Sequence, residues 1–272
     1  MPRANRCILP GQIYHLTHRC HDRAFLFRFG VDRTEYCRRL RAAVKQHRVS
    51  LLDFAITANH THLLAVCNRP RDISQMMKQV EGEFAANYNW RKGRRGAFWS
   101  DRFHCTMIQD GIHLLNCLRY IDLNMVRAGI VSHPREWEWC GYQELAGLRE
   151  RWCILDIDCL LKLVDVGDFA TFVQVHNARI DAAIIQRALG REPQWTESLA
   201  VGTEDYVRRV AGSLPRRKRL RYESTPFGAW CVRENDAMYG KVHIQPTDPL
   251  SVRQVRGRSE ACRVKSGLKN RF

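Results

Sequence analysis

The order of strand-like and helix-like segments predicts an α+β fold, in which helices cover an antiparallel sheet. Between residues 12 and 128, hydrophobic side chains follow periods of two and of 3.6 in the order strand–helix–strand–strand–helix–strand–helix. Connections between successive strands are short, which favours antiparallel neighbours. Hydrophobic residues make up 45% of the 272 residues, enough for a substantial core. This order is typical of ferredoxin-like folds.

Four strands and two helices are expected before residue 110. In chain order they are a strand at 12–20, a helix at 33–47, strands at 51–57 and 61–67, a helix from 72 or 74 to 88, and a strand at 103–108. Asp32 is expected to cap the first helix. In the first strand, His15 and His18 face opposite sides of the sheet. His18 is a candidate to approach a site, and a purely structural role is its simpler interpretation.

The C-terminal part of the chain predicts less regular structure. Helical periodicity returns at 167–190 and 204–214, and it fades from residue 222, where Pro, Gly and Ser recur among cations. We therefore expect a core domain at 1–165 and a helical accessory region with a basic segment at 166–221. A basic extension at 222–272 is expected to be flexible.

Two histidines stand one residue apart at the head of an apolar run. In a strand, side chains two residues apart point to the same face, so His60 and His62 would project together. Two imidazoles on one face of a strand can hold a divalent metal. The simpler alternative is two unrelated histidines near a turn.

A third helix is expected at 110–128, and it carries a tyrosine outside its apolar stripe. The stripe has the spacing i, i+4, i+7, i+11 and consists of Leu114, Leu118, Ile121 and Met125. Tyr120 lies roughly 120° away from it, beside Asn124. The same side of the helix carries His113, Asn116 and Arg127. Tyr120 is therefore a candidate functional residue, with a tyrosine at the edge of the core as the alternative.

The net charge of +16 is unevenly distributed and points to a polyanionic partner. Residues 206–272 contain 16 Lys/Arg and 5 Asp/Glu, so the C-terminal part is the most basic. Nucleic acid is the usual partner of such a chain, and a merely soluble basic protein is the alternative. The segment 89–96 also interleaves cations with Trp90, a composition suited to phosphates and unpaired bases.

The candidate nucleic-acid-binding residues share positive charge, an aromatic ring or a place beside the predicted site. They are Arg19, Arg91, Lys92, Arg94, Arg95, Trp99, Arg102, His104, Arg127, Arg216, Arg217, Lys218 and Arg219. The segment 206–272 is expected to add affinity for nucleic acid rather than catalysis.

No stretch of the sequence has the length and apolarity of a membrane span, and the N-terminus contains no signal-peptide core. The eleven cysteines are scattered and form no Cys-x-x-Cys pair. Reduced, buried thiols are therefore expected rather than a disulfide framework or a zinc ribbon. A cytoplasmic protein without a membrane partner is expected.

Four motifs together resemble the single-tyrosine HUH transposases (IS200-like), and among them the REP-associated tyrosine transposases. They are PGQIYH at 10–15, NHTHLL at 59–64, GAFWSDRF at 96–103 and CLRYIDLNMVRAG at 117–129. The resemblance covers about residues 8–145. Two positions depart from the family pattern, because Thr61 replaces a bulky hydrophobic residue and Met125 stands where proline is common.

The resemblance implies a ferredoxin-like HUH domain that cuts and joins single-stranded DNA beside hairpins. By motif position, His60 and His62 are the HUH histidines, Tyr120 is the nucleophile that forms a 5′-phosphotyrosine, and Asn124 completes the metal site. Mg²⁺ or Mn²⁺ would be the metal, since Mg²⁺ prefers oxygen ligands and Mn²⁺ accepts imidazole more readily. A bacterial, nucleoid-associated protein that acts as a monomer or homodimer is expected.

Two other functions are compatible with parts of the sequence. A non-catalytic protein that binds DNA or RNA hairpins could keep the fold, although it would be expected to lose Tyr120 or a histidine. A mononuclear iron oxygenase would need a His-x-Asp/Glu pair, whereas the close pair here is His-x-His.

Overall fold

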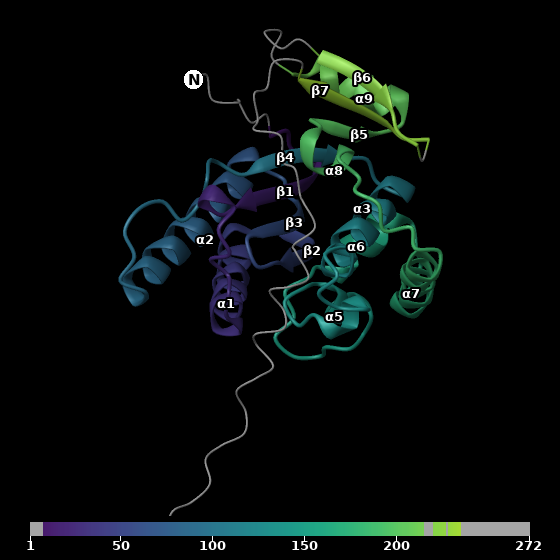
Figure 1. Ribbon diagram of the computed structural model, residues 1–272. Coiled ribbons are helices and arrows are strands. Elements are labelled where there is room, and N and C mark those ends of the chain that lie inside the picture. Colours follow the sequence, from purple (N-terminus) through teal and green to yellow (C-terminus); the bar gives the residue numbers. More distant parts are fainter. Residues whose placement is uncertain (1–7, 215–219, 227, 235–272) are drawn as a thin grey trace, which may run out of the picture. The chain divides into compact units, whose positions relative to one another are not determined.

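A seven-stranded, mostly antiparallel sheet with helices on both faces is the framework of the protein (Figure 1). The computed structural model describes residues 8–214, 220–226 and 228–234. The strands are β1 Ile13–Arg19, β2 Ser50–Ile56, β3 His60–Val66, β4 His104–Ile108, β5 Ala200–Gly202, β6 Leu220–Ser224 and β7 Trp230–Glu234. They lie in the order β2-β3-β1-β4-β5-β7-β6, and β4 with β5 is the parallel pair.

The helices alternate with the strands as the sequence predicts over the first half of the chain. They are α1 Gly30–His47, α2 Pro70–Arg91, α3 Ile112–Asp122, α4 Asn124–Arg127, α5 Tyr142–Leu145, α6 Ile157–Val164, α7 Phe169–Ile185, α8 Gln194–Glu197 and α9 Glu204–Gly212. Two 3-10 turns, η1 His21–Arg23 and η2 Pro134–Glu136, complete the set of described helical elements. The elements β1-α1-β2-β3-α2-β4 follow the ferredoxin-like order. The predicted α+β class and antiparallel core are confirmed.

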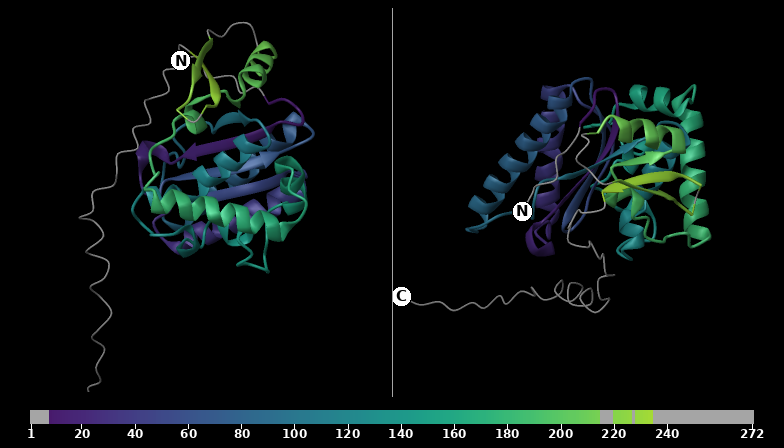
Figure 2. Two further views of the ribbon diagram at one scale, coloured as in Figure 1. Left: turned by 90° about the vertical axis from the view of Figure 1, so that its right-hand side faces the viewer. Right: turned by 90° about the horizontal axis from the view of Figure 1, so that it is seen from above.

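Each face of the sheet has its own hydrophobic core. Helices α1 and α2 cover one face, and α3, α6 and α7 cover the other (Figure 2). Side chains along β3 alternate between these cores, so Leu63 packs toward α1 and α2 while Leu64 packs toward α3. The alternation along β3 therefore decides which of its side chains face α3, the helix that carries Tyr120.

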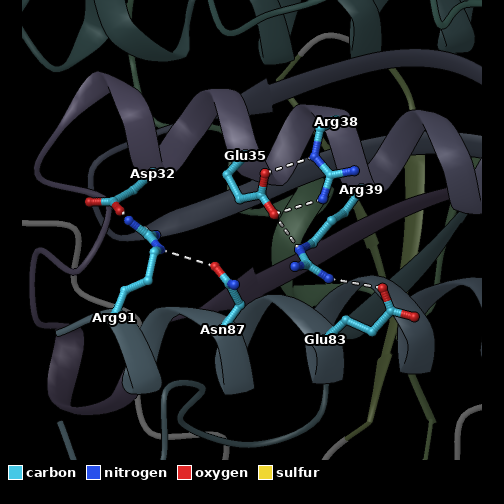
Figure 3. A network of polar contacts seen from close by, with 7 residues as sticks. All are labelled: Asp32, Glu35, Arg38, Arg39, Glu83, Asn87 and Arg91. Carbon is cyan, nitrogen blue, oxygen red and sulfur yellow. Dashed lines mark hydrogen bonds and ion pairs between the residues drawn. The ribbon is translucent and has the colours of Figure 1, made fainter. Parts of the chain in front are cut away.

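Helix α1 begins earlier than predicted, and Asp32 is not its cap. Phe29 takes the cap position, and Asp32 lies in the first turn with its side chain buried. Arg91 at the end of α2 forms an ion pair with this carboxylate at 2.8 Å and also donates to Asn87 (Figure 3). A buried carboxylate needs such a partner, so this pair ties α1 to α2.

The predicted third helix is interrupted at its C-terminal end. Helix α3 ends at Asp122, Leu123 has ψ of 4°, and the single turn α4 follows before Gly129 with φ of 66°. The break redirects the chain between Tyr120 and Asn124, and both side chains are buried.

Two short strands lie where the sequence predicts a flexible segment from residue 222. Strands β6 and β7 form an antiparallel hairpin, and β7 pairs with β5. Cys231 and Val232 of β7 are buried in the two cores, so this expectation is wrong for residues 222–226 and 228–234. Residues 235–272 and the candidates Arg216, Arg217, Lys218 and Arg219 lie outside the described residues. The domain boundaries at 165 and 221 stay predictions.

None of the helices described within residues 8–214, 220–226 and 228–234 is long and apolar enough to cross a membrane.

Candidate functional site

The pairing of β1 with β3 brings three histidines onto the face covered by α3. The register sets Arg19 opposite His60, Thr17 opposite His62 and His15 opposite Leu64. Residues directly opposite each other in an antiparallel pair share a face. The predicted common face of His60 and His62 is therefore present, and their ring centroids lie 4.8 Å apart.

The His62 ring is held between two polar neighbours. Its Nδ1 lies 2.8 Å from Nε2 of His15, and its Nε2 lies 3.0 Å from Nδ2 of Asn124. His15 in turn contacts the backbone carbonyl of Trp195 through Nδ1 at 2.8 Å. His62 is 1% exposed and His15 is 0% exposed, so this row of contacts is shielded from water.

His60 has partners on one ring nitrogen only. Its Nδ1 lies 2.7 Å from Oδ1 of Asn59 and 2.9 Å from the hydroxyl of Thr57. Its Nε2 is buried and has no hydrogen-bond partner among the described residues. A buried, unpartnered imidazole nitrogen is unusual and suits a ligand that binds there.

Tyr120 lies beside His15 of β1 and His62 of β3. Its ring centroid is 6.0 Å from that of His62 and 6.1 Å from that of His15. The guanidinium of Arg127 lies over the Tyr120 ring at 4.1 Å. The ring of Trp195 lies 6.3 Å away on another side, and Tyr120 is only 1% exposed.

Burial governs the protonation of these groups. It lowers the pKa of His15 and of His60 to about 3, with smaller contributions from nearby positive charges. It also lowers the pKa of His62 well below its usual value. The imidazoles are therefore neutral at physiological pH, the form that binds metals. Burial raises the pKa of Tyr120, and the charge of Arg127 opposes this shift.

The cations at the end of α2 have structural partners. Arg91 and Lys92 face the buried Asp32, at 2.8 and 4.0 Å, and Arg94 donates to the carbonyl of Ala97 at 2.8 Å. Arg95 is exposed in the same loop. Trp90, which precedes these cations, is 81% exposed.

The other candidates for DNA contact differ in burial and in their partners. Trp99 is half-buried, stacks on His18 with centroids 4.2 Å apart, and donates its indole N–H to the Glu81 carbonyl. Arg102 is exposed, whereas His104 contacts the Ser198 carbonyl at 3.1 Å.

Arg19 is half-buried on the histidine face. Burial lowers the pKa of Arg19, and the positive charges of Arg23 and Arg191 lower this pKa further. Among the candidates that the structure describes, Arg19 and Arg127 are the cations whose charges act on His60 and His62.

Sequence reasoning missed the contribution of His15 and of the segment 192–198. His18 lies on the opposite face, where it pairs with Glu81 and contacts the Asp101 carbonyl at 2.5 Å. Glu192 joins Arg119 of α3 at 3.0 Å and accepts the indole N–H of Trp195 at 2.9 Å. The alternation of the first strand already separated His15 from His18, but only the register shows which of them shares a face with His62.

Comparison with known proteins identifies similarity over the part of the chain that carries the three histidines, Tyr120 and Asn124. Residues 9–124 match the family described as "Transposase IS200 like". A solved structure described as a REP-associated tyrosine transposase bound to a REP hairpin aligns with a TM-score of 0.47 and 16% sequence identity, over 57% of this chain and 94% of that chain. Comparison with curated proteins gives no match.

Proposed function

Residues 9–124 belong to the IS200-like transposase family, and from this membership we propose that the chain is a metal-dependent endonuclease and strand transferase. Its substrate is single-stranded DNA next to a hairpin, and its fold is a ferredoxin-like HUH domain. The observation that carries the proposal is the convergence of His60 and His62 from β3, Tyr120 from α3 and Asn124 from α4 on one face of the sheet.

The nitrogen and oxygen atoms of His60, His62 and Asn124 are suitable ligands for a divalent cation. His60 offers a buried Nε2 without a protein partner, and Asn124 directs its amide toward Nε2 of His62. Among the described residues, no cluster of three His, Cys, Asp or Glu side chains could hold a metal. From the positions of His60, His62 and Asn124, the ligands would be two imidazoles and one amide oxygen, after rotation of the Asn124 amide. Mn²⁺ accepts imidazole readily, and Mg²⁺ would complete its coordination with oxygen ligands. A bound cation would neutralise charge on a phosphate oxygen and leave positions open for substrate.

Tyr120 is the proposed nucleophile. Its Oη attacks the phosphorus, a tyrosine–phosphate bond forms, and the bond to the 3′-oxygen breaks. The products are a 5′-phosphotyrosine and a free 3′-hydroxyl, so the strand can be rejoined. Arg127 over the ring favours the phenolate, whereas burial of the hydroxyl opposes it.

The direct test uses labelled single-stranded hairpin DNA and Mn²⁺. A covalent protein–DNA adduct that survives denaturation and maps to Tyr120 is the expected result. Cleavage without any adduct would mean that water is the nucleophile, and it would overturn the proposal.

One observation favours a non-catalytic hairpin-binding protein as the second candidate. Tyr120 is 1% exposed and its hydroxyl has a raised pKa, features of a structural tyrosine as well as of a resting nucleophile. This candidate predicts hairpin binding with neither adduct nor cut in the same experiment.

Asn124→Ala should reduce metal affinity and leave part of the activity. The substitution removes one of three proposed ligands while both imidazoles remain, so we expect cleavage to recover partly as the Mn²⁺ concentration rises. Titration of the cleavage rate against Mn²⁺, for the parent and the variant, measures the shift. An unchanged titration curve would remove Asn124 from the ligand set.

Single-stranded DNA beside a hairpin should be cleaved much faster than blunt duplex. Exposed Trp90 next to Lys92 and Arg95 suits unpaired bases, and stacking of one base contributes about 1–3 kcal/mol. Trp90→Ala should therefore weaken binding of single strands and leave duplex binding unchanged. Trp152→Ala is the matched control, because Trp152 is 77% exposed and lies outside the segment 89–96. Equal rates on both DNA forms would count against this substrate.

Deletion of residues 235–272 should weaken DNA binding and flatten its salt dependence. This segment contains 8 Lys/Arg and 3 Asp/Glu, and fewer counterions are released when these cations are absent. The deletion should begin after Glu234, since an earlier cut at 205 would remove α9 and β7, whose Val207 and Val232 are buried. Filter binding across a range of salt concentrations measures the slope, and an unchanged slope would assign the segment to another partner.

A further inference from the structure

We propose that His15 is a positioning residue that presets His62 as a metal ligand, and that the backbone carbonyl of Trp195 sets the orientation of His15. The inference deepens the proposed function and rests on it for the identity of the ligand. It joins the site to a segment, 192–198, that lies outside the family match at 9–124.

The Trp195 carbonyl determines which atom donates and which accepts in the hydrogen bonds that run from Trp195 through His15 and His62 to Asn124. A carbonyl oxygen only accepts, so Nδ1 of His15 carries the proton that it donates to Trp195. In a neutral imidazole the other nitrogen is then an acceptor, and Nε2 of His15 must accept from His62. The 2.8 Å contact therefore assigns the His62 proton to Nδ1. The lone pair of His62 is left on Nε2, which faces Asn124.

The opposite end of the row agrees with this assignment. Asn124 presents Nδ2, a donor, to Nε2 of His62 at 3.0 Å. In this orientation of the Asn124 amide, the donor faces an acceptor on the ring, which is compatible with the same tautomer. The carbonyl of Trp195 is the group that fixes the tautomer, because a carbonyl cannot exchange donor and acceptor roles as an amide can by rotating.

His60 is oriented in an equivalent way, by a hydrogen-bond chain that also ends at a backbone carbonyl. Asn59 donates through Nδ2 to the carbonyl of Arg23 at 3.2 Å, so its Oδ1 faces Nδ1 of His60. The His60 proton is then on Nδ1, and its lone pair is on the buried Nε2. Both histidines therefore present Nε2 lone pairs, and their supports differ only in the residue that provides the acceptor.

The carbonyl of Trp195 is itself fixed to the helix that carries Tyr120. The Trp195 indole donates to Glu192, and Glu192 pairs with Arg119 of α3, one residue before the proposed nucleophile. The rings of His15 and His62 are nearly parallel, at 13°, with centroids 5.0 Å apart. This packing leaves the His15 ring little freedom to rotate. The segment 192–198 therefore has two effects. The Trp195 carbonyl orients His15, and through it the proposed ligand His62, while the Glu192 side chain holds α3 through Arg119.

The first test reads the tautomer of His62 in the metal-free full-length protein. Long-range nitrogen–proton NMR correlations on protein labelled with ¹⁵N-histidine distinguish a protonated Nδ1 from a protonated Nε2. His15 and His62 should both carry the proton on Nδ1. A His62 protonated on Nε2 would overturn the proposal, whatever the protein does to DNA.

The second test measures Mn²⁺ binding by calorimetry for three variants. His15→Phe removes the acceptor for His62 and should weaken Mn²⁺ binding about 10–100-fold. His15→Gln keeps an acceptor oxygen near the place of Nε2 and should restore most of the affinity. Thr106→Val is the matched control, because Thr106 pairs with His15 across β1 and β4, is equally buried, and bonds the Ser198 carbonyl without touching His62.

The outcomes separate the positioning role from the proposed function. Parent affinity in His15→Phe, or equal losses in His15→Phe and Thr106→Val, would overturn the role of His15. Failure of the parent protein to bind Mn²⁺ would instead remove the metal from the proposed function, and the NMR result would still decide the tautomer. If His15→Phe does not fold, the comparison of His15→Gln with the parent and the NMR measurement decide the matter.

Discussion

Tyr120→Phe should fold, bind Mn²⁺ and bind hairpin DNA about as well as the parent protein, and it should neither cut DNA nor form an adduct. The substitution removes only the hydroxyl, and the ring keeps its contacts with Arg127 and Trp195. Loss of the nucleophile removes the covalent route entirely rather than a few kcal/mol of it. A denaturing gel with labelled hairpin DNA measures both products.

Tyr142→Phe is the matched control for this experiment. Tyr142 is equally buried in the core on the same face of the sheet, and its hydroxyl donates to Asn177 rather than to the site. It should cleave DNA at the parent rate. If Tyr120→Phe still cleaves and the adduct maps to Tyr14, Tyr88 or Tyr142, the assignment of the nucleophile to α3 is wrong.

His60→Ala and His62→Ala should each abolish detectable cleavage. Each variant removes one imidazole from the proposed metal site, and a metal contributes several kcal/mol to stabilisation of the transition state. The expected loss is therefore about 10³-fold or more in rate. Single-turnover cleavage in Mn²⁺ measures it, and thermal melting checks that β3 still pairs with β1 and β2.

Two results would contradict the metal role of these histidines. One is full activity in either alanine variant. The other is undiminished activity of the parent protein in excess chelator. Mn²⁺ binding to the alanine variants, measured as for His15→Phe, separates loss of the ligand from loss of the fold.

The central sheet and its covering helices could be predicted because their information is local. The period of two placed His60 and His62 on one face, and the period of 3.6 assigned Leu114 and Leu118 to the core of α3, where both are buried. The His-x-His motif and the helix that carries Tyr120 could thus be identified before any strand pairing was known. Periodicity alone could not show which residue of a neighbouring strand or helix each side chain contacts.

The missed features depend on contacts between distant residues. Asp32 has the residue type of a cap, yet it is buried against Arg91, which follows 59 positions later. The choice between His15 and His18 required the register of β1 against β3. The strands β5 and β7 are short and acquire their conformation from β4 and from each other, so they have little periodicity of their own.

The parallel pairing of β5 with β4 has a consequence for shortened forms of the protein. Met107 and Gln109 in and after β4 bond the backbone at Leu199 and Val201, so β5 occupies the outer side of β4. A fragment limited to residues 9–124 would leave β4 as an open edge strand with unpaired backbone groups. Such edges recruit strands from other molecules, and the fragment would be prone to aggregate in solution. The smallest unit of this protein that keeps β4 paired should therefore extend through Glu234.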